Sequence, residues 1–483
     1  MPDLIVHDGV VVSMDDRDRL VSPGTVVVDD GRIVAVRPTD EGDRSPAAAA
    51  RTIDADGDVV VPGLVDAHRH TDFSLVGGLF DDLDPGVLLR EAMALYHGAE
   101  ETLGESFFEA AWRLACLRQV ANGVTTVNAM DFTPRIGART VGETGLRAVI
   151  GPELSDFLDP RPPAEQVADA RAFVEDYHGA YDDRVRASIA PGGETGCSRA
   201  LWAEVADLRR AFPGLRLHTH LLDTSEAGLM ARGGGADDPL SLLDEHGLLD
   251  ERTLLTHCIH ADREDARRIA DAGASVLHCA TVYSYFRAGE RAWFPLPALR
   301  EFDVPVAIGL DDPFWFGHWD LLREGKHARV LANYEYGAHQ WSSYDLLGAL
   351  TRDAADALDL PVGRLEAGGR ADLVVLGVDD ARHRPSSDVP ALVANALSGG
   401  DVRTTVVDGE VLYHEGTVAT MDVADVVASA ERERERLCAE TGWETTLAGS
   451  SPPETSILRR VNARPVFRML RHAARGAVGR VVG

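Results

Sequence analysis

The stretch VVVPGLVDAHRH, residues 59–70, decides how this chain folds. It begins with apolar and β-branched residues, which is typical of a buried strand, and it ends in two histidines. His68 and His70 are two residues apart, so on a strand their side chains point to the same side. Two imidazoles at one strand end suit a shared metal ion, although a strand that simply ends in polar residues has the same pattern.

Similar segments recur through the middle of the chain. Further short strands are predicted at VTTVNAM (124–130), LRAVIGPEL (146–154), VRASIAP (185–191), LRLHTH (215–220), TLLTHC (253–258), ASVLHC (274–279) and VPVAIGLDD (304–312). Helical patterns separate them. Strand–helix alternation predicts an α/β fold with a parallel sheet, and eight such units predict a (β/α)₈ TIM barrel whose active site lies at the carboxyl ends of the strands.

The two ends of the chain share another pattern, in which β-branched runs are broken by Asp-Gly turns typical of hairpins. Residues 1–59 and 361–420 are therefore predicted to form one composite small β domain, a β-sandwich, with the barrel of residues 60–360 inserted between them. Residues 421–483 are predicted as a helical C-terminal extension. Its tail, residues 458–483, holds seven arginines and no acid, and either docks on an acidic surface or stays solvated.

Composition limits the partners of this chain of 483 residues. The net charge of −30 argues against nucleic acid, because an acidic surface repels phosphate. No apolar run reaches the roughly 18 residues that span a bilayer, and the start of the sequence lacks a signal-peptide pattern. Five scattered cysteines, an odd number, do not suggest a disulfide framework. We therefore expect a cytoplasmic protein with no membrane partner.

Further polar residues end the later predicted strands: His220, His257 and Asp311. Strand ends of one barrel converge on its axis, so these residues would join the two histidines in a nitrogen and oxygen ligand set for Zn²⁺ or Fe²⁺. His218 lies two residues before His220 on the same predicted strand, one step further from the strand end. It is predicted to be a buried, hydrogen-bonded histidine. Arg69 is predicted to point away from the metal and to form a structural ion pair.

These motifs together resemble the amidohydrolase superfamily, in the mononuclear-metal branch of adenosine-type and guanine deaminases and triazine chlorohydrolases. The resemblance covers about residues 3–420 and is carried by VVVPGLVDAHRH, HTHLLDTSE, LLTHCIHAD, VLHCATV, VAIGLDD and GRLEAGGRADLVVLGV. It implies the metal ligands His68, His70, His220 and Asp311. It also implies that Asp311 takes a proton from water and that His257 orients water or polarises the substrate.

The resemblance implies one divalent metal ion, with Zn²⁺ favoured over Fe²⁺. Binuclear relatives use a carbamylated lysine on the fourth strand, whereas VRASIAP contains no lysine and the single lysine, Lys326, lies beyond the eighth strand. The implied enzyme is a metal-dependent hydrolase of C–N bonds other than peptide bonds, which deaminates a small N-heterocycle. A small-molecule substrate and a homo-oligomer are expected. Four aromatic residues are candidates for the wall of a planar-ligand pocket or for packing: Phe314, Trp315, Phe316 and Trp319.

One departure from the family's pattern keeps other functions open. Relatives place a glutamate three residues after the fifth-strand histidine as a proton shuttle, and this chain has Asp223 there, with Glu226 one turn further on. Aspartate is one methylene shorter, about 1.5 Å of reach. The change suits ring opening of a cyclic amide or a non-hydrolytic reaction in specialised metabolism as alternatives to deamination. A non-catalytic barrel that binds a ligand is a third reading.

Overall fold

The structure is a computed structural model that describes residues 1–45, 47–80, 95, 102–159, 161–223, 238–286, 293–312, 318–447, 449–451 and 453. The predicted Arg-rich tail lies outside these residues, as do Glu226, Phe314, Trp315 and Phe316. Within the described ranges, no helix is both long and apolar enough to cross a membrane.

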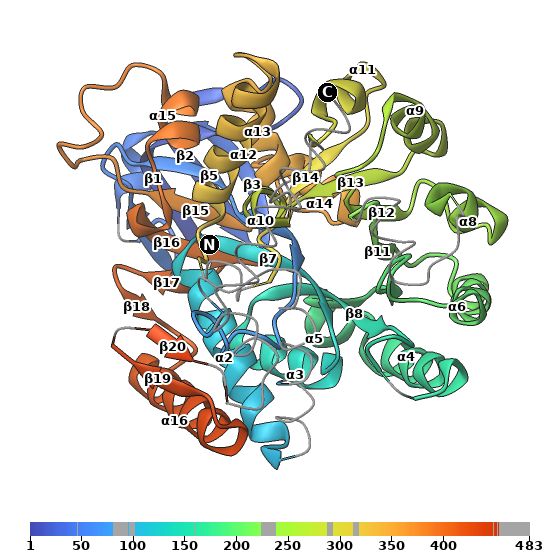
Figure 1. Ribbon diagram of the computed structural model, residues 1–483. Helices are drawn as coiled ribbons and strands as arrows, with labels where there is room; N and C mark the ends of the chain where they lie inside the picture. Colours follow the sequence, from blue (N-terminus) through green and yellow to red (C-terminus); the bar gives the residue numbers. More distant parts are fainter. Residues whose placement is uncertain are drawn as a thin grey trace.

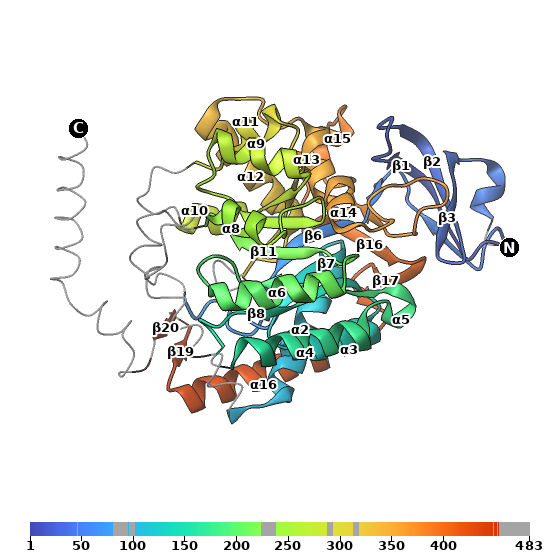
Figure 2. The ribbon, with the colours of Figure 1, turned by 90° about the vertical axis from the view of Figure 1, so that its right-hand side faces the viewer.

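Both ends of the chain contribute to one nine-stranded sheet, in the order β18-β17-β16-β15-β5-β1-β2-β3, with β4 paired to β1. Its strands are β1 (Leu4–Val12), β2 (Leu20–Asp29), β3 (Arg32–Pro38), β4 (Arg51–Asp54), β5 (Val59–Pro62), β15 (Leu373–Leu376), β16 (Val402–Val407), β17 (Glu410–His414) and β18 (Thr417–Val418). Two of the predicted Asp-Gly turns are hairpins with positive φ at both residues: Asp30–Gly31 joins β2 to β3, and Asp408–Gly409 joins β16 to β17. The turn expected at Asp8–Gly9 is wrong, because these residues lie inside β1 at a shift in its pairing with β2. Strands β1 to β3 lie on the far side of the molecule from helix α16 (Val423–Thr441) (Figure 2).

The middle of the chain forms two parallel sheets, which confirms the predicted strand–helix alternation (Figure 1). The first contains β6 (Leu64–Arg69), β7 (Val124–Asp131), β8 (Arg147–Leu154), β9 (Val185–Ala187) and β10 (Ala190–Pro191). The second contains β11 (Leu217–Leu221), β12 (Thr253–His257), β13 (Ser275–His278) and β14 (Val306–Ile308). Single parallel bridges, Ile189 to Leu217 and Arg69 to Asp311, join the two sheets at both edges.

The stretch predicted as the first barrel strand is two strands that belong to different sheets. Strand β5 pairs with β15 and β1 of the chain-end sheet, whereas β6 pairs with β7. The chain crosses between the sheets at Gly63, where an added Cβ would lie 2.1 Å from the Thr125 hydroxyl oxygen. The apolar pattern runs unbroken through both strands because both are buried, so periodicity alone does not reveal the crossing.

Helices follow most of the parallel strands. They are α2 (Glu105–Ala121), α3 (Pro134–Thr144), α4 (Pro163–Tyr177), α5 (Ala180–Asp183), α6 (Arg199–Ala211), α8 (Pro239–Glu245), α9 (Arg263–Ala272), α10 (Ala280–Phe286), α11 (Leu296–Glu301), α12 (Leu321–Tyr336), α13 (Ser343–Leu350), α14 (Arg352–Leu358), α15 (Val389–Asn395) and α16; short 3₁₀ turns lie at Glu41–Arg44 and Gly399–Asp401, and a hairpin of β19 (Glu444–Thr446) and β20 (Gly449–Ser451) follows α16. Helix α9 shows how the sequence sets these bounds: the Asp262 carboxylate accepts the amides of Glu264 and Asp265, and Gly273 at φ +74° ends the helix.

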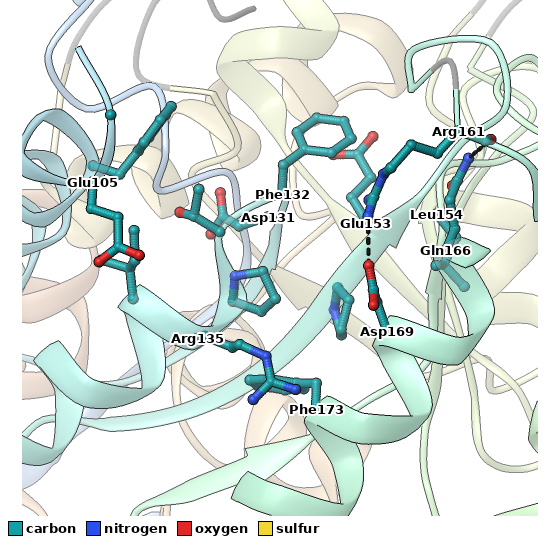
Figure 3. A pocket seen from close by; sticks show the side chains of 16 residues that line it. Glu105, Asp131, Phe132, Arg135, Glu153, Leu154, Arg161, Gln166, Asp169 and Phe173 are labelled. Atoms are coloured by element: carbon teal, nitrogen blue, oxygen red, sulfur yellow. Dashed lines mark hydrogen bonds and ion pairs between the residues drawn. The ribbon is translucent and has the colours of Figure 1, made fainter. Parts of the chain in front are cut away.

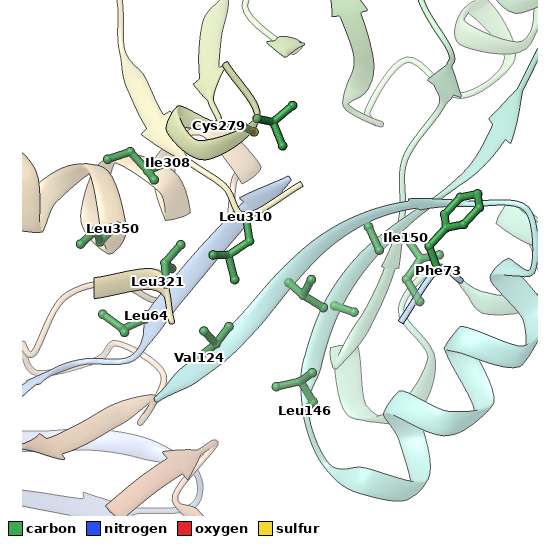
Figure 4. Packing of buried hydrophobic residues seen from close by; sticks show 14 of the residues in the cluster. Leu64, Phe73, Val124, Leu146, Ile150, Cys279, Ile308, Leu310, Leu321 and Leu350 are labelled. Atoms are coloured by element: carbon green, nitrogen blue, oxygen red, sulfur yellow. The ribbon is translucent and has the colours of Figure 1, made fainter. Parts of the chain in front are cut away.

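The main hydrophobic core lies between the parallel strands and their helices. Leu64 and Val124 come from the adjacent strands β6 and β7, and Leu321 and Leu350 come from helices α12 and α13 (Figure 4). All four side chains are almost completely buried. Burial of apolar surface at roughly 25 cal/mol per Å² is the main force that holds the strand ends in a fixed arrangement.

Arg147, at the start of β8, ties the parallel sheet to the chain-end sheet. Its side chain is 2% exposed, and its Nε and Nη2 each lie 3.1 Å from a carboxylate oxygen of Asp372. The Nη2 atom also donates to Asp408 at 2.7 Å. Asp408 also pairs with Arg370 at 3.0 Å, so removal of the guanidinium would leave the buried Asp372 as the carboxylate without a cation.

We expect Arg147→Met to lower the free energy of unfolding by about 3–5 kcal/mol, the range for breaking a buried ion pair. Arg113→Met is the matched control, because Arg113 pairs with Glu143 at 2.6 Å on the surface and such pairs contribute about 1 kcal/mol or less. Urea unfolding followed by circular dichroism measures both variants. Equal, small losses in the two variants would show that the Arg147 contacts do not hold the sheets together.

Candidate metal centre

The strand ends bring four predicted ligands to one point. His68 lies in β6, His70 follows it, His220 lies in β11 and Asp311 follows β14. The Nε2 atom of His220 is 3.2 Å from Nε2 of His70 and 3.3 Å from Nε2 of His68. The Oδ1 atom of Asp311 is 3.5 Å from Nε2 of His68 and 3.9 Å from Nε2 of His70.

These separations fit the edges of a small coordination polyhedron. A tetrahedral zinc ion with Zn–N distances of about 2.0–2.1 Å keeps its ligand atoms about 3.3 Å apart. The three imidazoles each offer a ring nitrogen to one place, and the neighbouring Asp311 carboxylate offers an oxygen and a negative charge. The residues therefore fit a divalent cation, and the nitrogen and oxygen donor set suits zinc or iron.

The backbone of this region is shaped to bring Asp311 against His68. The Asp311 amide donates to the His68 carbonyl oxygen at 2.8 Å. A Cβ on Gly309 would lie 2.5 Å from the His68 amide nitrogen, so glycine permits this close approach. Asp311 has φ +60° and His257 has φ +77°, conformations that non-glycine residues adopt rarely and mostly where the surrounding structure enforces them.

His257 completes the group at the end of β12. Its Nε2 atom lies 3.5 Å from Oδ2 of Asp311, and its ring stacks on that of His220 with centroids 5.3 Å apart. Desolvation lowers the pKa of His220 to about 3 and also lowers the pKa of His257. The pKa of Asp311, which burial alone would raise, is held well below its ordinary value by His68 and its neighbours. At neutral pH Asp311 is therefore an anionic carboxylate, and His220 and His257 are neutral imidazoles, the forms that bind metal.

A second histidine fixes the ring of His68. Nε2 of His218 lies 2.8 Å from Nδ1 of His68, and both rings are buried. The amide of Asn128 lies 3.2 Å from the other nitrogen of His218 and donates to the carbonyl oxygen of Ala67. His218 is thus the buried, hydrogen-bonded histidine that the sequence predicts, and it turns Nε2 of His68 toward the cluster.

Two acidic residues that the sequence analysis did not single out lie behind the site. Oε2 of Glu153, in β8, is 3.6 Å from Nδ1 of His70, and burial raises the pKa of Glu153 to about 8. Asp131 accepts the amides of Thr71 and Asp72 at 2.6 and 2.9 Å, which ties the segment after His70 to the end of β7. In sequence these acids are ordinary polar strand ends, so only proximity in space connects them to the metal centre.

Asp223, the predicted proton shuttle, lies two residues beyond the end of β11. Its carboxylate raises the pKa values of His220 and His257, against the larger effect of desolvation, so it lies near both rings. One of its oxygens is buried and has no hydrogen-bond partner in the part of the chain that the structure describes. A buried acceptor of this kind is open to a substrate group.

Arg69 forms no contact ion pair with a described residue, and Asp66 is the carboxylate whose charge acts on it most strongly. Its guanidinium lies over the ring of Trp319, 3.7 Å from the centroid, and its nitrogens hydrogen-bond to none of the described residues. Both side chains are buried. Trp319 therefore packs against Arg69, so of the four predicted aromatic wall residues, the described one takes the packing role.

Comparison with known proteins adds independent evidence. A family model described as the amidohydrolase family matches residues 59–412. The chain is 32% identical over 414 residues to a 5-methylthioadenosine/S-adenosylhomocysteine deaminase from Natronomonas pharaonis, covering 84% of this chain and 92% of the relative. It is 28% identical over 447 residues to a 5'-deoxyadenosine deaminase from Methanosarcina mazei, covering 91% of this chain and 99% of the relative.

Solved structures agree at the level of the fold. An adenosine deaminase from Xanthomonas campestris with bound zinc superposes with a TM-score of 0.82 at 25% identity, covering 91% of this chain and 99% of that one. The zinc-complexed atrazine chlorohydrolase from Arthrobacter aurescens superposes with a TM-score of 0.79 at 22% identity, covering 89% of this chain and 100% of that one. With the family model spanning most of its length, this chain belongs to the amidohydrolase family.

Proposed function

We propose that this protein is a metal-dependent hydrolase that deaminates a small N-heterocycle, with adenine nucleosides altered at the 5' position as the substrate class. The observation that supports this most directly is the group of His68, His70 and His220, in which Nε2 of His220 lies 3.2 and 3.3 Å from the other two Nε2 atoms, the spacing of zinc ligands, with an Asp311 oxygen 3.5 Å from His68. The names of the similar proteins, deaminases of 5'-deoxyadenosine and of 5-methylthioadenosine or S-adenosylhomocysteine, support the substrate class.

In this proposal His68, His70, His220 and Asp311 hold one divalent ion, and zinc is favoured over iron. A divalent ion bound there lowers the pKa of a water molecule toward neutrality and polarises the carbon under attack. Asp311 accepts the proton that this water loses, through the oxygen that faces His257. The new C–O bond forms at the carbon that carries the amino group. Asp223 takes up the second proton of the added water and passes it to the nitrogen as the C–N bond breaks, so that ammonia leaves, and Asp311 passes the first proton to the heterocycle. His257 orients the oxygen by hydrogen bonding.

The barrel, the domain bounds and the location expected from the sequence are part of the same proposal. The two parallel sheets close into a (β/α)₈ barrel over about residues 60–360, and residues 1–59 with 361–420 form the small β-sandwich domain. The bridges at both sheet edges support closure. Residues 421–483 form the C-terminal extension. A cytoplasmic location, the lack of nucleic-acid and membrane partners, and a homo-oligomeric state complete the proposal.

The proposed deamination is tested by ammonia release. Protein loaded with one equivalent of zinc is incubated with 5'-deoxyadenosine and with 5-methylthioadenosine, and ammonia and the change in nucleobase absorbance are measured. We expect equimolar ammonia from at least one of the two nucleosides. Absence of ammonia from both nucleosides, with the zinc in place, would overturn the proposed substrate class. Ring opening of a cyclic amide or a non-hydrolytic reaction would then be the favoured alternatives.

The role of Asp223 makes a separate prediction. Asp223→Asn removes the acid and is expected to lower kcat by about a hundredfold or more, the lower end of the effect of a positioned general acid. Asp223→Glu keeps the carboxyl with about 1.5 Å more reach and is expected to stay within about tenfold of the unmodified enzyme. Steady-state rates with the zinc content of each variant measured decide the matter. Equal rates in Asp223→Asn and the unmodified enzyme would assign the leaving-group proton to another residue.

A further inference from the structure

A cavity of about 500 Å³ lies at the ends of β7 and β8, and one of its lining residues, Glu153, contacts the ring of His70. Its lining side chains are shown in Figure 3. Its floor is formed by the carboxyl ends of β7 and β8, where Asp131 and Glu153 lie, and its walls come from helices α2, α3 and α4. Glu153 lines the cavity and also contacts the proposed metal centre, because its carboxyl lies 3.6 Å from Nδ1 of the proposed ligand His70. The cavity therefore adjoins the proposed reaction centre, and part of a substrate can occupy it.

The two arginines of the cavity are already paired. Arg135 donates to Asp176 at 2.6 Å, and Arg161 pairs with Asp159 and Asp169 at 2.6 and 2.5 Å. Both arginine side chains are more than two-fifths exposed, so they lie toward solvent at the rim. The charge of each arginine is thus balanced by the aspartates that it pairs with. Neither arginine pairs with Asp131 or Glu153 on the floor of the cavity.

Neither acid of the floor forms an ion pair with a described arginine or lysine, although the charge of the buried Arg69 acts on Asp131. Asp131 is 1% exposed, and its Oδ2 atom accepts no hydrogen bond from any described residue, while Oδ1 accepts two backbone amides. Glu153 is 8% exposed, and its one ion-pair contact is the distant ring of His70. Burial raises the pKa of Glu153 to about 8 and that of Asp131 well above its ordinary value, and a cation in the cavity would favour the ionised form of both.

The rest of the lining suits an organic cation rather than a hydrated metal ion. Phe108, Phe132 and Phe173 line the same cavity, and aromatic faces attract an ammonium group. The volume is far larger than one ion needs and matches the lower range of cavities that hold small organic ligands. Phe132, Asp131 and Glu153 are drawn together among the lining side chains in Figure 3.

We propose that this cavity is a subsite for a protonated aliphatic amine carried on the substrate, recognised by Asp131 and Glu153. The inference rests on the proposed function, and it goes beyond it by naming the charge of the substituent that the enzyme prefers. An aliphatic amine keeps its proton at neutral pH, so it offers the positive charge and the N–H donors that these two carboxyls lack.

The test compares two nucleosides that differ only at the 5' carbon: 5'-amino-5'-deoxyadenosine and 5'-deoxyadenosine. The measured quantity is the ratio of their kcat/KM values in one zinc-loaded preparation, which cancels any difference in metal content or folded fraction. We expect the amine to be preferred by roughly tenfold to a hundredfold, the worth of a hydrogen bond to a charged group. In Glu153→Gln and Asp131→Asn the ratio should fall to near one.

Glu165→Gln is the matched control, because Glu165 is an exposed acid on α4 that does not line the cavity. It should leave the ratio unchanged. A ratio near one in the unmodified enzyme, or a ratio that survives both floor variants, would overturn the subsite. If neither nucleoside is deaminated, the proposed function fails, and a binding measurement then tests the subsite. The amine should raise the Tm of the zinc-loaded protein more than 5'-deoxyadenosine does. An equal or smaller rise in Tm would overturn the subsite.

Discussion

Asp311→Asn is expected to lower kcat by roughly a hundredfold to ten-thousandfold while the protein keeps its fold. The substitution is nearly isosteric, but an amide cannot accept the proton that water must lose. Asp311 is suited to that role because its pKa lies well below the ordinary value and its Oδ2 atom is buried without a hydrogen-bond partner among the described residues. The measurement is kcat with the best substrate of the ammonia-release assay.

Asp244→Asn is the control for the Asp311 variant, since Asp244 is an exposed acid on α8 away from the cluster. It should keep the full rate. Metal content must be measured alongside, because Asp311 is also a proposed ligand. A variant Asp311→Asn that retains more than about a tenth of the rate would remove Asp311 from the proton transfer.

His220→Ala is expected to abolish activity through the loss of the metal. Nε2 of His220 lies within 3.3 Å of the corresponding atoms of both His68 and His70, so its removal opens one side of the donor set. Metal-ion catalysis supplies several kcal/mol of transition-state stabilisation, which corresponds to at least about a thousandfold in rate. Steady-state kinetics and elemental analysis of the same sample measure both losses.

His246→Ala, at the end of α8 and outside the cluster, should change neither quantity. Activity that returns when excess zinc is added to His220→Ala would mean that the remaining ligands suffice. Full activity without added metal would contradict the assignment of His220 as a ligand.

Much of the site follows from local sequence patterns. The two-residue spacing of His68 and His70 places both side chains on one face of a strand, and the structure brings their Nε2 atoms to the same cluster. His220 and Asp311 are found because polar residues at the ends of buried strands meet at one edge of parallel sheets. Each of these predictions needs only the period of a strand and the direction of a sheet.

Other features depend on contacts between distant parts of the chain and leave no local signal. His218 meets His68 across 150 residues, and Glu153 meets His70 across two strands. The contact ion pair expected for Arg69 is not formed with any described residue, because alternation gives the direction of a side chain but not what it meets, which is the ring of Trp319. Likewise, one unbroken apolar run covers β5 and β6, although they lie in different sheets.

The central claim is that His68, His70, His220 and Asp311 hold one catalytic divalent ion, and metal content tests it most directly. Elemental analysis is performed on the protein purified after growth with added zinc and on the His68→Ala/His70→Ala double variant. We predict about one equivalent of zinc in the first and almost none in the second. Two equivalents would contradict the single-ion site inferred from the absent fourth-strand lysine. No metal, even after reconstitution, would contradict the account as a whole.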